Sequence, residues 1–260
     1  ESVDYIGSSA FENCDGIVEV VLPSAITVIE NNTFKNCFAL SKINLENVKI
    51  FKNSCFYDCM ALHYIEVGPE TTNIESNAFY NCDALGGTID ISMVSSIQSN
   101  AFNGCDRIEG IVIPDVKHDM SAYSSCPNVE AYYTTENNKD YLSINGALHS
   151  KDGKTLLVYP ATRKDTTLKI SDTVTTIGAR AFYGSKYLET VVINNSVTKL
   201  EDEAFANSSI TTIFIPDSIK RIGFDTFKDC KQLKWAVFGE GVEVIGSGNF
   251  TGASALELVI

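Results

Sequence analysis

Cysteine is the residue type with the most reactive chemistry in this chain, because a thiol can form a disulfide, bind a metal or act as a nucleophile. Seven of the eight cysteines share one position, three residues after a recurring aromatic residue: Cys14, Cys37, Cys59, Cys82, Cys105, Cys126 and Cys230. Ser185, Ser208 and Ala253 take the same position elsewhere. A position that accepts Cys, Ser and Ala predicts a small buried side chain, so we interpret these residues as free buried thiols.

Two other roles for the thiols follow from their spacing. If successive copies stack, their Cα atoms come close enough for disulfides, but parallel Cβ vectors would stand too far apart without local distortion. Bridges between adjacent copies therefore remain the alternative. Cys55 and Cys59 lie four residues apart, yet Cys55 replaces the alanine that precedes the aromatic residue elsewhere. No CxxC pair or nearby histidine completes a tetrahedral set, so we predict no metal site and no cofactor.

Catalytic motifs are missing from the sequence. Gly153-Lys154-Thr155 ends like a phosphate-binding loop, but Leu148 stands where that loop requires its first glycine. The three histidines, His63, His118 and His149, have no serine or cysteine at motif spacing, and no GxSxG, HExxH or GxGxxG sequence occurs. We therefore expect no enzymatic activity.

The positions that carry these residues belong to an internal repeat. Its aromatic residue recurs at intervals of 21 to 23 residues within two blocks: Phe11, Phe34, Phe56, Phe79, Phe102 and Tyr123, then Phe182, Phe205, Phe227 and Phe250. A large apolar residue precedes it by five places and another follows by six. An alternating apolar pair after that, such as Ile43/Leu45, predicts a short strand. Repeats of this length predict a solenoid in which parallel strands of successive turns form one sheet.

The repeat divides the chain into three segments of one continuous solenoid. Residues 1–133 hold about six turns, of which the sixth is degraded, because Tyr123 replaces Phe and His118 replaces the expected Ile. We expect that shortened turn to rotate His118 outward. Residues 134–165 interrupt the repeat, and Asn145-Gly146 and Asp152-Gly153 predict two hairpin turns with positive φ in an antiparallel β-meander. Residues 166–260 hold about four more turns, the last truncated.

Composition and charge exclude several partners. The net charge is −13, and no run of Lys and Arg forms the basic stripe that nucleic acid requires, so we predict no nucleic-acid partner. No apolar run approaches the ~20 residues of a membrane span, which argues against direct membrane insertion. The chain opens at Glu1 and closes at Leu258-Val259-Ile260, within a predicted strand, and we interpret it as a processed or trimmed piece.

The repeat resembles the BspA-like (Treponema pallidum type) leucine-rich repeats over nearly the whole chain. The resemblance rests on Ile177-Gly178-Ala179-Arg180-Ala181-Phe182 and on Ile213-Phe214-Ile215-Pro216-Asp217-Ser218-Ile219. It implies a leucine-rich-repeat solenoid of the α/β type, with mostly short parallel strands and short helices or turns, forming a right-handed curved rod with an inserted antiparallel β-meander. The interruption with Tyr159-Pro160 is also similar to one common in that family.

The resemblance further implies a cell-surface or secreted protein, most often of host-associated bacteria, whose relatives are implicated in adhesion. We therefore predict a non-catalytic, adhesin-like binding module that presents a curved β-sheet to a host or matrix protein or a glycan. The alternative is a structural spacer or stalk in a larger surface protein.

Strand alternation predicts which residues face outward and could bind a ligand. If Ile111 and Ile113 point inward, Gly110 and Val112 point outward, as do their equivalents in every turn. In the first block these equivalents are mostly polar or small: Glu19, Lys42, Asn44, Tyr64, Glu66, Thr88 and Asp90. Later they become apolar, and the candidate ligand-binding residues are Tyr133, Val192, Phe214, Trp235 and Val237. Contact with the meander or with a further turn is the competing explanation for these side chains.

Overall fold

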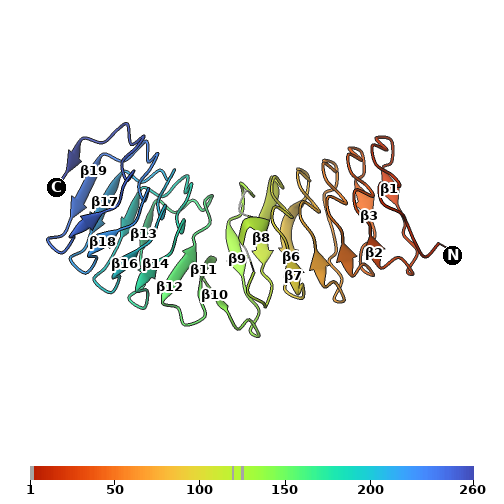
Figure 1. The fold of residues 1–260 in the computed structure, drawn as a ribbon, viewed down its shortest axis with the longest axis horizontal. Coiled ribbons are helices and arrows are strands. Elements are labelled where there is room, and N and C mark those ends of the chain that lie inside the picture. Colours follow the sequence, from red (N-terminus) through yellow and green to blue (C-terminus); the bar gives the residue numbers. More distant parts are fainter. Residues whose placement is uncertain (1–2, 119, 124–125) are drawn as a thin grey trace. The chain divides into compact units, whose positions relative to one another are not determined.

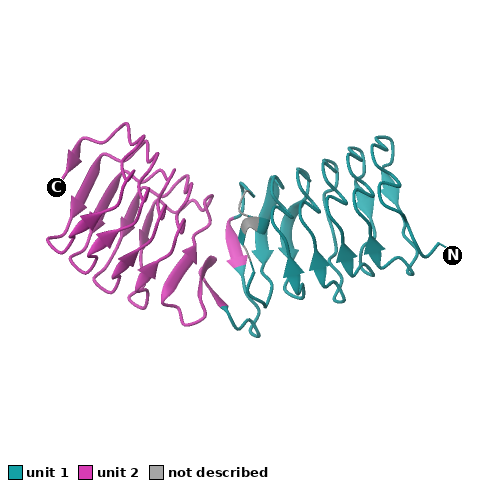
Figure 2. Cartoon of the chain, in the orientation of Figure 1, with its two compact units in different colours: residues 1–129, 133–140 teal, residues 130–132, 141–260 magenta. Residues whose placement is uncertain are grey.

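The computed structural model describes residues 3–118, 120–123 and 126–260. These residues form short β-strands joined by turns, together with one three-residue 3-10 helix, η1 (Met120–Ala122) (Figure 1). They make two compact units: unit 1 holds residues 1–129 and 133–140, and unit 2 holds residues 130–132 and 141–260 (Figure 2). The short helices expected in the repeats are replaced by turns, so the fold is a β-solenoid with almost no helix.

Unit 1 has two series of short parallel strands, one on each side of the turns. The first series pairs β1 (Glu19–Val20) with β3 (Lys42–Ile43) and β6 (Gly86–Asp90) with β8 (Arg107–Val112). The second forms a four-stranded sheet of β2 (Val28–Ile29), β4 (Ile50–Phe51), β5 (Asn73–Ile74) and β7 (Ser96–Ile97). The residues of β9 (Ala131–Tyr133) are divided between the two units.

Unit 2 contains the predicted antiparallel meander, formed by β10 (Tyr141–Ile144), β11 (Ala147–Ser150) and β12 (Thr155–Val158). The meander opens a seven-stranded sheet that continues in parallel through β14 (Thr176–Ile177), β16 (Lys199–Leu200), β18 (Arg221–Ile222) and β20 (Val244–Ile245). A five-stranded parallel sheet covers the other side, in the order β13 (Thr167–Lys169), β15 (Thr190–Val192), β17 (Thr212–Ile215), β19 (Trp235–Phe238) and β21 (Leu258–Val259).

Each regular turn thus contributes a second strand that the repeat pattern did not predict. This strand ends at the apolar residue five places before the aromatic one, as in Val28–Ile29 and Thr176–Ile177. In each of these strands except β20 only the second residue is buried, and a segment of two residues is too short to show an alternation in the sequence. The expectation of one sheet was therefore wrong, because strands from successive turns build two series of sheets.

The recurring aromatic residues stack along the core of each unit. Phe34 and Phe56 have ring centroids 5.2 Å apart, and Phe182 and Phe205 have centroids 4.7 Å apart with an angle of 6° between the rings. All four of these rings are fully buried. Because a single turn cannot bury its own ring on both faces, the stack makes each turn depend on its neighbours.

All eight cysteines are free thiols, and seven of them occupy the position beside this stack. At that position each buried thiol donates a hydrogen bond to the carbonyl oxygen of the aromatic residue one turn earlier, as in Cys59 to Phe34 (3.1 Å) and Cys230 to Phe205 (3.0 Å). Cys55, next to the aromatic residue, donates instead to Ala78 O in the following turn. Burial raises the pKa of the Cys55 thiol well above its ordinary value. The buried cysteines therefore act as small hydrogen-bond donors in the core, whereas Cys14 and Cys126 are only partly buried.

Left-handed backbone conformations close each turn that is built around a phenylalanine of the repeat. They occur two residues before and two residues after it, as at Asn32 (φ 56°) and Asn36 (φ 59°). Asparagine tolerates this conformation better than most residues, which explains its recurrence there. The side chains also stack between turns, since Asn36 Nδ2 donates to Asn13 Oδ1 at 2.7 Å.

The degraded sixth turn and the meander turns differ in part from expectation. His118 does not rotate outward: it is half-buried, its Nδ1 lies 2.8 Å from Val116 O, and its Nε2 is hydrogen-bonded to the hydroxyl of the buried Tyr123. The phenolic oxygen that replaces Phe thus provides a partner for the imidazole. Asn145 (φ 50°) and Gly146 (φ 77°) form the predicted turn, whereas in the second turn only Gly153 has a positive φ.

Candidate functional site

The outward face of the five-stranded sheet in unit 2 holds four of the five predicted site residues. The parallel register aligns these side chains in two columns that cross the strands. The first column contains Lys169, Val192, Phe214 and Val237. The second contains Thr167, Thr190, Thr212, Trp235 and Leu258. We call this surface the strand face of unit 2.

Burial agrees with the predicted alternation of faces on these strands. Phe214 is 59% exposed, Trp235 48% and Val192 45%, whereas Ile213 and Ala236, their inward neighbours, are fully buried. Val237 is only half-buried, because Phe214 lies beside it in the register. The faces are therefore assigned as the sequence predicted.

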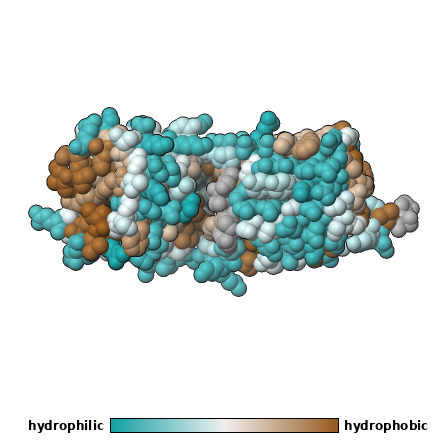
Figure 3. Space-filling view, turned by 45° about the horizontal axis from the view of Figure 1, so that its top comes forward, coloured by the Kyte–Doolittle hydropathy of each residue, from teal (hydrophilic) through white to brown (hydrophobic). Residues whose placement is uncertain are grey.

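Phe214 and Trp235 are diagonal neighbours on the strand face. Trp235 pairs with Thr212, and Phe214 lies two residues further along the same strand. Strand spacing and residue rise together place their Cα atoms about 8 Å apart. The apolar surface continues onto Leu258, which pairs with Trp235, and Figure 3 shows hydrophobic side chains gathered at the end of unit 2, at left. Leu258 was not among the predicted site residues, although the register of the repeat aligns it with Trp235.

Tyr133, the remaining predicted residue, lies in unit 1 and is 46% exposed. Its carbonyl oxygen accepts a hydrogen bond from Ile113 N at 3.0 Å. Gly110 was expected to be an open outward position, but it is buried. A side chain added there would lie 3.0 Å from the Tyr133 ring and 2.7 Å from Thr88 Oγ1. The ring of Tyr133 therefore packs against Gly110.

The strand face of unit 1 is more polar than that of unit 2. Glu19 and Lys42 are paired in the register and form an exposed ion pair at 2.6 Å. Apolar exceptions are Tyr64, which was predicted to face outward, and Val21, which was not included. Both are exposed, and the exposed Glu66 lies two residues from Tyr64.

Charge is distributed unevenly between the units. Unit 1 has 19 Asp and Glu against 7 Lys and Arg, whereas unit 2 has 14 against 13, so almost all of the net charge of −13 belongs to unit 1. In unit 2, exposed carboxylates of Asp172, Asp217 and Glu240 follow one border of the strand face. The other border is formed by the residues that directly precede the strands, among them Glu189 before β15, Lys234 before β19 and Glu257 before β21.

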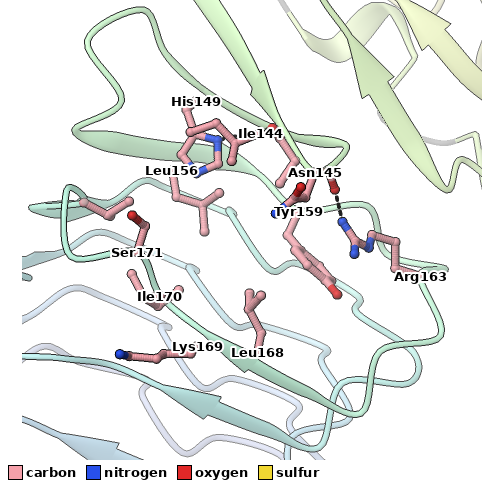
Figure 4. A pocket seen from close by; sticks show the side chains of 12 residues that line it. Ile144, Asn145, His149, Leu156, Tyr159, Arg163, Leu168, Lys169, Ile170 and Ser171 are labelled. Atoms are coloured by element: carbon pink, nitrogen blue, oxygen red, sulfur yellow. Dashed lines mark hydrogen bonds between the residues drawn. The ribbon is translucent and has the colours of Figure 1, made fainter.

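A cleft of about 130 Å³ lies elsewhere in unit 2, between the β10–β11 hairpin and β13 (Figure 4). Leu156, Leu168 and Ile170 give it an apolar lining, and the buried His149 lies on its hairpin side. Burial lowers the pKa of His149 below its ordinary value. This cleft could not be predicted from the sequence, because it arises where the meander meets the first regular turn of unit 2.

Neither a metal centre nor a membrane helix is found among residues 3–118, 120–123 and 126–260. No group of three His, Cys, Asp or Glu side chains is arranged to hold a metal ion there. The same residues contain no helix with the length and hydrophobicity to span a bilayer.

Comparisons with solved structures show where the fold recurs. A leucine-rich repeat protein from Eubacterium ventriosum is 25% identical, with 97% of this chain and 68% of that one covered at a TM-score of 0.76. A leucine rich cell surface protein from Faecalibacterium prausnitzii is 23% identical, with 97% and 75% covered at 0.57. The pneumococcal vaccine antigen PcpA is 17% identical, with 93% and 67% covered at 0.55. These similarities support the repeat fold.

No curated protein matches the chain in a sequence search. The model of the BspA type leucine rich repeat region, in contrast, matches six copies over residues 1–109 and 159–260. The unmatched segment, residues 110–158, contains the degraded turn and most of the meander. Because this model matches both blocks of repeats, the chain belongs to the BspA type leucine rich repeat family.

Proposed function

We propose that this chain is a non-catalytic, adhesin-like binding module that acts at the cell surface or outside the cell and binds a host or matrix protein through the strand face of unit 2. The observation that carries the proposal is the exposure of Phe214 and Trp235 as diagonal neighbours beside Val192. Exposed aromatic side chains that sit together on a rigid sheet are typical anchors of binding surfaces.

The composition of the strand face favours a protein ligand over a glycan. Val192, Phe214 and the half-buried Val237 form an unbroken apolar column across three strands. Apolar side chains of a protein partner would be buried against such a column, which is the usual composition of an interface centre. The carboxylates at its border, such as Asp217 and Glu240, then form a polar rim.

A surface or extracellular location is supported by the family and by the relatives. Two similar structures are a cell surface protein and a vaccine antigen by description. We extend that location to this chain as part of the proposal.

Binding to arrays of purified matrix proteins and of host glycans tests the proposal. We expect saturable binding to a protein, weakened about 30-fold or more by Trp235→Ala or Phe214→Ala, because anchor truncation costs at least about 2 kcal/mol. Lys42→Ala and Glu19→Ala are the matched controls, since an exposed ion pair contributes little. Circular dichroism checks that each variant folds.

Three results would contradict the proposal. Equal binding by the aromatic variants and the controls would show that the ligand binds outside the strand face of unit 2. Selective binding to a glycan would show that the ligand is a glycan and not a protein. Failure to bind any array member would favour a spacer role for the repeats.

A further inference from the structure

The five-stranded sheet of unit 2 has an open edge in the middle of the chain. Its first strand is β13, which pairs with β15 on one side. In a regular solenoid the preceding turn would supply a strand for the other side. Here the meander precedes β13, but its last strand, β12, joins the seven-stranded sheet by pairing with β14. Within the described residues, no strand pairs with the second edge of β13.

The hydrogen-bond pattern shows which backbone groups face that edge. Thr190 N donates to Thr166 O and Ile170 N donates to Val192 O, both at 3.0 Å. In a parallel pair, alternate residues of a strand bond to the same neighbour. The backbone groups of Thr167 and Lys169 therefore point away from β15. Both residues are exposed, so their N–H and C=O groups present a template for another strand.

The cleft of about 130 Å³ runs along this edge and is held open by fixed contacts (Figure 4). Arg163 donates to Asn145 O in the hairpin turn and forms an ion pair with Asp165 at 2.6 Å. Its guanidinium also lies 5.3 Å from the centroid of the Tyr159 ring, and Tyr159 donates to Asp165 at 2.8 Å. These contacts tie the hairpin to the chain segment before β13 and fix the walls of the cleft.

Charge around the edge is positive, in contrast to the chain as a whole. Three basic residues, Arg163, Lys164 and Lys169, lie on β13 or in the segment just before it, against Asp165 before the strand and Asp172 after it. Asp165 is occupied by Arg163, and Asp172 accepts a hydrogen bond from Asn194 Nδ2 at 2.6 Å. Lys164 and Lys169 are exposed, and Lys169 stands on the outward face of β13 itself.

We propose that the free edge of β13 binds an extended acidic peptide segment of a partner protein by strand addition. The backbone of the segment would bond to Thr167 and Lys169. Its side chains would alternate, so apolar residues enter the cleft beside Leu168 while acidic residues stand beside Lys169 on the outward face. This site adjoins the strand face at Lys169 but includes neither Phe214 nor Trp235. Trp235→Ala and Phe214→Ala therefore test the proposed function, whereas Lys169→Glu and the N-methylated peptides test the edge.

The probe for this site is a fluorescein-labelled hexapeptide that alternates aspartate with leucine, titrated against the full chain by fluorescence anisotropy. Two derivatives carry N-methyl groups, one on the leucines and one on the aspartates. Only one set of amides can point at β13, so one derivative is expected to bind at least about tenfold more weakly while the other binds like the parent. Hydrogen exchange adds a second readout, with protection gained at the amides of Thr167 and Lys169.

Protein variants separate strand addition from adsorption to a charged surface. Lys169→Glu is expected to weaken binding about tenfold, whereas Lys220→Glu, an exposed lysine next to the seven-stranded sheet, is the matched control and leaves binding unchanged. Equal binding of the two N-methylated peptides overturns the proposal even if Lys169→Glu weakens binding, because the edge is then not used. Absence of binding at millimolar peptide also overturns it.

Discussion

Replacing Phe182 with alanine is expected to destabilise unit 2 by about 3–5 kcal/mol. The Phe182 side chain is fully buried, and its ring lies between Tyr159, at a centroid distance of 5.3 Å, and Phe205, at 4.7 Å. Truncation removes both ring contacts and leaves a cavity that two stacked neighbours cannot fill. Because each aromatic pair adds about 0.5–1.5 kcal/mol beyond burial, the loss should fall in the upper part of the range.

Urea unfolding measures this loss, with the emission of Trp235 as the probe, since the only tryptophan of the chain lies in unit 2. Tyr183→Ala is the matched control. Tyr183 follows Phe182 directly, is 37% exposed and contacts Arg180, whose guanidinium lies 3.9 Å from its ring centroid. Its loss should cost about 0.5–1 kcal/mol. If Phe182→Ala destabilises unit 2 no more than Tyr183→Ala does, the aromatic stack does not hold the turns together.

Three further predictions concern the thiols, pH and the tight turns. All eight cysteines should react with a thiol reagent in denatured, unreduced protein. In folded protein the buried thiols should react slowly, because burial limits access and raises the pKa of thiols such as Cys55 and Cys230; a requirement for reductant would indicate disulfides. Burial lowers the pKa of His149, so as the pH falls the unfolded chain binds a proton at this residue before the folded chain does. The free energy of unfolding should therefore decrease as the pH drops below about 6.5, and it should decrease less in His149→Gln. Equal pH dependence of the two proteins in urea unfolding would refute this. Gly184→Ala should lower the free energy of unfolding by about 1–2 kcal/mol, because Gly184 has a left-handed conformation. Gly104→Ala should lower it further, because the new Cβ would also lie 2.2 Å from Asn81 Oδ1. Equal losses for the two variants in urea unfolding would contradict this prediction.

Features that repeat in every turn could be predicted from the sequence. The repeat positions that hold an aromatic residue, a Leu or Ile, or a small residue predict which side chains stack in the core. Phe102, Leu188 and Cys105, which occupy these three positions, are all buried in the structure. The alternation of apolar pairs also placed Phe214 and Trp235 outward. Both inferences rest on burial, which is the property that repeats most faithfully between turns.

Features that arise once, or from very short segments, could not be predicted. The second strand of each turn holds two residues, which is too short to show a period. The partner of His118 is the hydroxyl of Tyr123, and the sequence pattern treats that tyrosine only as an imperfect phenylalanine. The edge of β13 is open because β12 joins the seven-stranded sheet, and the spacing of residues does not predict which sheet β12 joins.

Trp235 offers the most direct measurement of the proposed binding surface, because it is the only tryptophan and its side chain is half-exposed on the strand face. The measurement is its fluorescence emission and its quenching by acrylamide, with and without a saturating amount of the matrix protein that the binding array identifies. Ligand binding at the strand face of unit 2 predicts a blue shift of the emission and reduced quenching. Unchanged emission and quenching at saturation would show that the ligand binds elsewhere and contradict the proposed function.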